Sequence, residues 1–235
     1  MLIVKKKPFI IGTVMAFTFL VVLVLMFLPL LGGRNAFEAS DRLFNSIAKA
    51  SSDHFELLRR EAADHRGSSF DAAMTFRSES LAAEVRAMLA KAGVKAEGKG
   101  VRVEAVGDLY EVARAVIDDS EAMFHNRGLE IAQKYGSPER QTLLAWWNIL
   151  KEMQRVFESK GRFQAATFLH DLTVKGVEVA YNFYGVEPEN ASTSAATLVG
   201  TLVFYVLYTL WWGYAILYMF NGLGMEMKAG AKKEV

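Results

Sequence analysis

Residues 196–220 read ATLVGTLVFYVLYTLWWGYAILYMF, and the uncharged stretch around them runs from Asn190 to Met225. A helix needs about 20 apolar residues to cross the hydrocarbon core of a membrane, and this stretch is longer than that. A second apolar run extends from Pro8 to Leu31. Because the two runs lie near opposite ends of the chain, they predict transmembrane helices at residues 8–31 and 194–222 that flank one domain at residues 32–193.

Lysine residues gather on the outer flanks of the two spans. They are Lys5, Lys6 and Lys7 before the first span, and Lys228, Lys232 and Lys233 after the second. Basic residues beside a span favour the cytoplasmic side. We therefore expect the chain to lie in the inner (plasma) membrane, with residues 1–7 and 223–235 in the cytoplasm. The domain between the spans is expected to be extracytoplasmic, and periplasmic in a Gram-negative cell. The first run exceeds the roughly 7–15 apolar residues of a signal peptide, so we expect it to be retained as an anchor.

The composition narrows the classes of function. Residues 32–193 hold 21 basic and 24 acidic side chains, so the net charge of the domain is −3. Affinity for nucleic acid comes mainly from Lys and Arg that neutralise phosphates, and a nucleic-acid partner is therefore not expected. The chain has no cysteine, which excludes disulfides and thiolate metal sites. Neither predicted span contains Asp, Glu, Lys, Arg or His, so the sequence offers no ion relay.

The domain is predicted to be mainly helical, with a small α/β element at about residues 70–106. Apolar periodicity and capping signals predict helices at residues 36–63, 79–92, 109–127, 139–159 and 163–184, with Gly128 ending the third of them. Two alternating segments joined by Gly98-Lys99-Gly100 predict a β-hairpin. Residues 70–76 fit either a strand or a helix. Since two strands alone are marginal, we expect this segment or a strand of a neighbouring copy to complete the sheet.

Two of these helices have well-defined apolar faces. The face predicted for the helix at residues 139–159 consists of Leu143, Trp147, Leu150, Met153 and Phe157. The face predicted for the helix at residues 163–184 includes Ala166, Leu169, Thr173, Val177, Ala180 and Tyr184. Only a few residues separate the two helices, so they should pack as an antiparallel hairpin. Trp146-Trp147 and nearby phenylalanines fit either the core or a pocket for a quinone.

Small and polar residues in the two spans form a candidate helix–helix interface. The second span carries Thr197, Thr201, Tyr205, Tyr208 or Thr209, and Trp212 at steps of three or four residues, with Gly200 and Gly213 nearby. The first span offers Gly12 and Ala16, one turn apart. In lipid, helices associate through small residues and polar groups. The alternative is that Tyr and Trp simply populate the membrane–water interface.

Histidine and carboxylate residues supply two candidate ligand sites in the domain. His125 and His170 would bind a b-type haem if their helices bring them together. Glu61 and His65 are four residues apart, and with the adjacent Asp64 they offer two or three metal ligands. The alternative for Glu61, Asp64 and His65 is that they form a solvated helix end, supported by ordinary i, i+4 side-chain pairing.

No catalytic motif stands out, so we expect neither enzymatic activity nor a resident cofactor. The sequence predicts that the chain is a structural or assembly subunit of a membrane complex. Such a subunit packs its spans and its extracytoplasmic domain against other membrane-protein subunits or against copies of itself in the lipid bilayer. The alternative is a ligand-binding or electron-transfer subunit that holds haem, a metal or a quinone in the domain.

Overall fold

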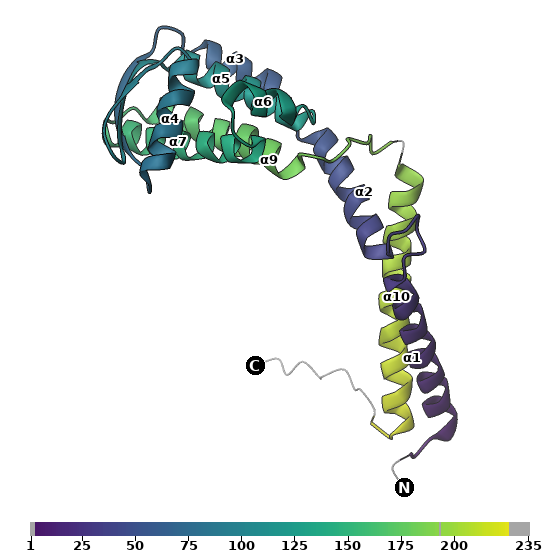
Figure 1. The fold of residues 1–235 in the computed structure, drawn as a ribbon. Coiled ribbons are helices and arrows are strands. Elements are labelled where there is room, and N and C mark those ends of the chain that lie inside the picture. The colour runs from purple at the N-terminus through teal and green to yellow at the C-terminus, as the bar shows by residue number, and fades with distance from the viewer. Residues whose placement is uncertain (1–2, 193, 226–235) are drawn as a thin grey trace, which may run out of the picture. The chain divides into compact units, whose positions relative to one another are not determined.

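The computed structural model describes residues 3–192 and 194–225. It is mostly helical, with 69% of residues in helices, and contains one three-stranded antiparallel sheet (Figure 1). The helices are α1 Lys6–Phe27, α2 Ala36–Ser51, α3 Phe55–Ala63, α4 Glu79–Lys91, α5 Leu109–Phe124, α6 Gly128–Tyr135, α7 Glu139–Ser159, α8 Phe163–Asp171, the π-helix η1 Leu172–Glu178, α9 Val179–Phe183 and α10 Ala195–Gly222. The strands are β1 Ser69–Thr75, β2 Lys95–Glu97 and β3 Arg102–Asp108.

The chain divides into two compact units. The first, which we call the helical hairpin, combines the chain up to Ile47 with the chain from Glu189 onward. The second, which we call the domain, runs from Ala48 to Pro188. The boundary between the two units falls inside α2. Residues 36–47 of that helix belong to the hairpin, and residues 48–51 belong to the domain. The predicted domain began earlier, at residue 32.

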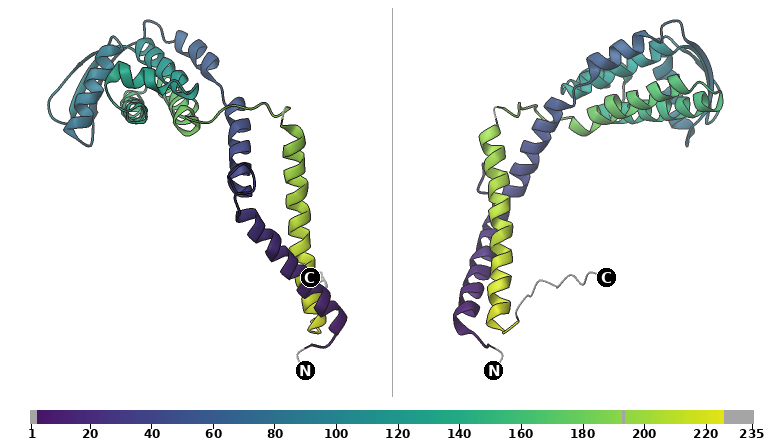
Figure 2. Two further views of the ribbon diagram at one scale, coloured as in Figure 1. Left: turned by 45° about the vertical axis from the view of Figure 1, so that its right-hand side comes forward. Right: turned by 180° about the vertical axis from the view of Figure 1, so that it is seen from behind.

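Helices α1 and α10 pack side by side and antiparallel in the hairpin (Figure 2). Both are long and apolar enough to cross a membrane by length and composition. The predicted first span ran to residue 31, but α1 ends at Phe27. Leu28 leaves the helix with ψ of 146° because it precedes Pro29, whose ring disfavours helical geometry in the preceding residue.

Glycines permit the close contact between α1 and α10. A Cβ added to Gly12 would lie 2.5 Å from the backbone nitrogen of Met219 and 2.8 Å from the carbonyl oxygen of Ala215. A Cβ added to Gly222 would lie 2.5 Å from the Cβ of Phe9. Any larger residue at either position would therefore push the two backbones apart.

Helix α2 begins at a capping box. The backbone N–H of Asn35 donates to Glu38 Oε2, while the N–H of Glu38 donates to Asn35 Oδ1 over 2.9 Å. The prediction of one helix from residue 36 to 63 is wrong, because α2 stops at Ser51 and α3 starts at Phe55. The hydroxyls of Ser51 and Ser52 both donate to the carbonyl of Ala48, and such local bonds compete with the helix.

The sheet has the order β1-β3-β2, with Ala72 of β1 opposite Ala105 of β3. Residues 70–76 therefore form mainly strand, and this strand completes the sheet within the chain. One face of the sheet is buried against α4, α5 and α7, through Phe70, Ala72, Met74, Val103 and Ala105. The other face of β1 is exposed, in strict alternation.

Helix α5 starts as predicted but ends earlier. The side chain of Asp108 accepts a hydrogen bond from the backbone of Tyr110 and caps the helix. The predicted terminator Gly128 instead opens α6. The chain turns at Asn126, which has φ of 60°, and asparagine tolerates this left-handed geometry better than most residues. Gly128 permits a close contact with Tyr184, because a Cβ at this position would lie 2.5 Å from the Tyr184 hydroxyl.

Helices α7 and α8 pack against each other and supply much of the core. The predicted face of α7 needs one correction, because Trp146 is fully buried whereas Trp147 lies half-buried at the edge. The predicted helix at residues 163–184 is present almost throughout as α8, η1 and α9. Its predicted apolar face from Ala166 to Ala180 is buried as expected.

Candidate functional sites

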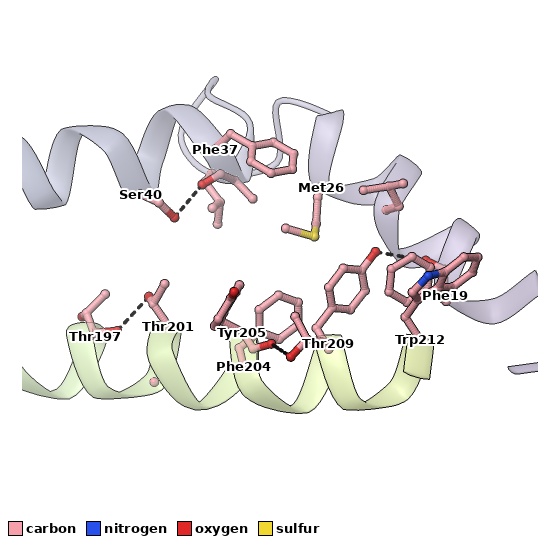
Figure 3. Close-up of a pocket in the computed structure, with 15 residues that line it drawn as sticks. Phe19, Met26, Phe37, Ser40, Thr197, Thr201, Phe204, Tyr205, Thr209 and Trp212 are labelled. Atoms are coloured by element: carbon pink, nitrogen blue, oxygen red, sulfur yellow. Dashed lines mark hydrogen bonds between the residues drawn. The ribbon is translucent and has the colours of Figure 1, made fainter. Parts of the chain in front are cut away.

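A groove of about 750 Å³ lies in the hairpin, between α10 and the α1–α2 segment (Figure 3). We call it the α1/α10 groove. Its lining residues are Phe19, Leu23, Met26, Leu31, Ala36, Phe37, Ser40, Thr197, Gly200, Thr201, Phe204, Tyr205, Tyr208, Thr209 and Trp212. None of them carries a charge, so the groove is a neutral and mainly apolar site.

The groove continues the face with which α10 contacts α1. Towards its C-terminus, that face carries Ala215, Met219 and Gly222 against α1. The same face, followed at steps of three or four residues towards the N-terminus, reaches Thr201 and Thr197. At that end the face no longer meets another helix closely, since a Cβ added to Gly200 would have no atom within 4 Å. One face of α10 is therefore packed at one end and open at the other.

Aromatic rings close the end of the groove nearest the helix contact. The rings of Phe19 and Tyr208 stack with their centroids 4.1 Å apart, and the ring of Trp212 lies 4.7 Å from that of Phe19 in a tilted arrangement. The Tyr208 hydroxyl donates to the carbonyl of Phe19 over 3.3 Å. Phe204 stacks on Tyr208 from within α10. This end of the groove is therefore mainly aromatic.

Hydroxyl groups line the opposite end. Figure 3 shows Ser40 on one wall and Thr197 and Thr201 on the other. The Ser40 hydroxyl donates to the carbonyl of Ala36 over 2.8 Å, and the Thr201 hydroxyl donates to the carbonyl of Thr197 over 2.9 Å. A hydroxyl has one proton and two lone pairs. With their protons directed to the backbone, these oxygens face the groove as acceptors.

Most of the predicted interface residues line this groove or the helix contact. Gly12 makes the close contact, and the groove collects Thr197, Gly200, Thr201, Tyr205, Tyr208, Thr209 and Trp212. Ala16 is half-buried on α1. Gly213 has no atom within 4 Å of an added Cβ, so it lies away from both features.

Several residues of the groove and of the helix contact were not predicted from the sequence, among them Gly222, Phe37 and Ser40. Gly222 could have been found, because Ala215, Met219 and Gly222 continue the stripe at steps of four and three residues. Phe37 and Ser40 could not, since their place in the groove depends on the turn between α1 and α2.

The two candidate haem ligands are both exposed side chains. His125 caps the C-terminus of α5, and His170 lies near the end of α8. The His125 ring contacts Phe124 edge-on, at a centroid distance of 5.4 Å. The structure gives neither imidazole a place inside an apolar pocket, where an axial haem ligand would be expected.

Glu61, Asp64 and His65 lie around the end of α3. No cluster of three or more His, Asp or Glu side chains that could hold a metal ion occurs in the described residues. The His65 ring instead packs on Phe168, with centroids 4.6 Å apart. Burial lowers the pKa of His65 below its ordinary 6.5, Asp64 and Glu61 oppose the shift, and Arg162 adds to it.

The lowered pKa of His65 predicts a pH-dependent stability. Below about pH 6.5 the unfolded chain takes up a proton at His65 before the folded chain does, so stability should fall as the pH falls. In thermal unfolding of the detergent-solubilised chain, H65Q should reduce the loss of Tm between pH 7.5 and 5.5. Equal losses in wild type and H65Q would contradict the assignment.

Asp119 is a buried carboxylate with a full set of partners. It is 3% exposed and accepts hydrogen bonds from Trp146 Nε1 at 2.8 Å, from the Tyr135 hydroxyl at 2.6 Å and from Lys134 Nζ at 2.7 Å. Burial and the neighbouring Asp119 raise the pKa of Tyr135. Asp119 thus ties α5, α6 and α7 together at one point.

Lys49 is a buried ammonium group held by oxygens. It is 1% exposed and donates to Asn126 Oδ1 at 3.3 Å and to the carbonyls of Phe183 and Val186. Its Nζ also lies 5.0 Å from the centre of the Phe124 ring. Burial lowers the pKa of Lys49, and Glu187 opposes the shift. Lys49 therefore fixes the segment after α9 to the last turn of α2.

Replacing Lys49 with methionine should destabilise the domain by about 2–4 kcal/mol, because the acceptors around it lose a buried donor while the volume is kept. Thermal or chemical unfolding of the full chain in mild detergent measures the change. K151M removes an ammonium group from half-buried Lys151 of α7, beside the ring of Trp147, and should cost much less. Similar losses in both variants would contradict the role given to Lys49.

A smaller groove of about 280 Å³ lies beside Trp147, between α7 and the η1–α9 segment. The indole N–H of Trp147 donates to Glu178 Oε1 over 2.9 Å. Trp146 lies in the core and does not line this groove. The two tryptophans therefore do not form one pocket.

Comparison with protein-family models, with curated proteins and with solved structures finds no match to the chain.

Proposed function

We propose that the chain is a membrane-anchored structural or assembly subunit. The observation that carries the proposal is the antiparallel packing of α1 and α10 through Gly12 and Gly222. Because the pair is antiparallel, the C-terminus of α1 and the N-terminus of α10 lie at the same end, and the chain between them emerges on one side of the membrane. Both termini then lie on the other side, and the lysines beside them favour the cytoplasm.

The domain supports a structural role more than a chemical one. Among the described residues, the buried charged side chains are Lys49 and Asp119. Each is held by at least three hydrogen bonds inside the protein. Buried groups of this kind fix one arrangement of helices, whereas a catalytic acid or base must face a substrate. The domain thus presents a rigid surface to partner subunits or to further copies of the chain.

The composition of the native particle tests this proposal. The full chain is extracted from its native membrane in mild detergent, and the mass of the intact particle, its protein companions and its visible spectrum are recorded. We expect a particle that contains several copies or a defined set of companions and shows no visible absorbance. A monomer without companions, or one that carries a chromophore, would overturn the assembly role.

A further inference from the structure

We propose that the α1/α10 groove binds a single-chain lipid whose neutral head group donates hydrogen bonds, as a monoacylglycerol or a long-chain alcohol does. The site goes beyond the assembly role, but it rests on the membrane placement proposed with it. Its volume of about 750 Å³ falls within the range of roughly 300–1,000 Å³ that is typical of small-molecule sites.

The size of the groove favours a flexible chain over a helix. An α-helix with its side chains is about 10–12 Å across, so a neighbouring helix would fill this volume only with side chains. A hydrocarbon chain can instead lie along the groove from the hydroxyl end to the rings of Phe19 and Trp212. Tyr205, which is 64% exposed, would be covered by the occupant.

The polarity of the walls gives the occupant a direction. The hydroxyls of Ser40, Thr197 and Thr201 lie at the end where α10 begins, which is the membrane surface on the side of the domain. The rings of Phe19, Tyr208 and Trp212 contact one another deeper in the groove, between α1 and α10. An amphipathic molecule would therefore place its head between Ser40 and Thr201 and its chain towards the rings.

The hydrogen bonds of Ser40 and Thr201 favour a head group that donates. The hydroxyls of Ser40 and Thr201 donate to their own helix backbones, which leaves their lone pairs for an incoming donor. A hydroxyl head supplies that donor, whereas an ester or a quinone offers only acceptors. No charged residue lines the groove, so an ionised head would gain no ion pair there.

Gly200 and Gly213 provide a matched pair of variants. Both are on α10, and an added Cβ meets no atom within 4 Å at either position, so neither substitution should disturb the packing with α1. Gly200 lines the groove and Gly213 does not. G200L therefore fills the site, while G213L adds the same side chain elsewhere on the helix.

Photo-crosslinking in phosphatidylcholine nanodiscs tests the inference. The probes are a monoacylglycerol and the methyl ester of the same fatty acid, each with a diazirine in its chain. We expect the monoacylglycerol to label peptides that line the groove, with at least a fivefold loss in G200L and no loss in G213L. The methyl ester should label the same peptides at least fivefold less.

Three results would overturn the inference. Equal labelling by both probes would show that the head group is not recognised. Labelling that G200L does not reduce would show that the probe lies only in the surrounding lipid. A native particle in which a partner helix crosslinks to Thr197 or Thr201 would show that protein covers the groove. Failure of the chain to enter nanodiscs would instead refute the membrane placement.

Discussion

Replacing Asp119 with alanine should lower the free energy of unfolding by about 3–5 kcal/mol, the typical cost of removing one partner from a buried ionic network. The change leaves the buried indole N–H of Trp146 and the hydroxyl of Tyr135 without their acceptor. Each stranded donor costs about 1–3 kcal/mol, and the vacated volume adds to the loss. Chemical denaturation of the full chain in mild detergent, followed by tryptophan fluorescence, measures the difference.

Asp118 supplies the control, because it precedes Asp119 on α5 and is also a carboxylate. Its side chain is 42% exposed and pairs with Arg59 at the surface. Exposed pairs contribute about 0–1 kcal/mol, so D118A should cost much less than D119A. If the two variants lost the same stability, the buried network would not be the point that joins the three helices.

Replacing Gly12 with leucine should separate α1 from α10. The new side chain begins 2.5 Å from the backbone nitrogen of Met219, and backbone cannot move aside as a flexible side chain can. The chain has no cysteine, so a V4C/G224C pair reports the contact without background. A Cβ at Gly224 lies 3.4 Å from the Cβ of Val4, close to the roughly 3.5–4.5 Å found in disulfides. The φ of 81° at Gly224 strains the cysteine placed there, and this strain is the same with and without G12L.

We expect the V4C/G224C disulfide to form in the otherwise unchanged chain and to form at least tenfold more slowly with G12L added. G213L, which places leucine where α10 has open space, should have no effect. Rapid disulfide formation in the G12L variant would contradict the close packing on which the proposed anchor depends.

Local signals predicted the ends of most elements well. Ser78 caps α4, Asp108 caps α5, and Gly93 with φ of 80° follows the end of α4, as their residue types indicate. The pattern of residues 70–76 was ambiguous because Ala72, Ala73 and Met74 are compatible with both structures. The pairing of β1 with β3 decides for a strand, and that pairing is a long-range contact that periodicity cannot show.

The predictions that were wrong or incomplete concern features that depend on contacts which the sequence pattern does not report. Residues 36–63 keep a helical pattern through Ser51 and Ser52, so the break comes from side-chain hydrogen bonds that the pattern does not report. Trp146 and Trp147 are adjacent, and both indoles donate to a carboxylate, so the helices packed around α7 decide which one is buried. The stripe of α10 was visible in the sequence, but the groove that it lines also needs Phe37 and Ser40 from α2.

The orientation of the chain in the membrane is the most direct test of the account. Single cysteines are placed at Val4, before α1, and at Lys99, in the exposed turn between β2 and β3. Intact cells are then treated with a maleimide that cannot cross the cytoplasmic membrane. We predict that K99C is labelled in intact cells and that V4C is labelled only after the membrane is opened. Labelling of both positions in intact cells, or of V4C alone, would contradict the proposed hairpin anchor with cytoplasmic ends.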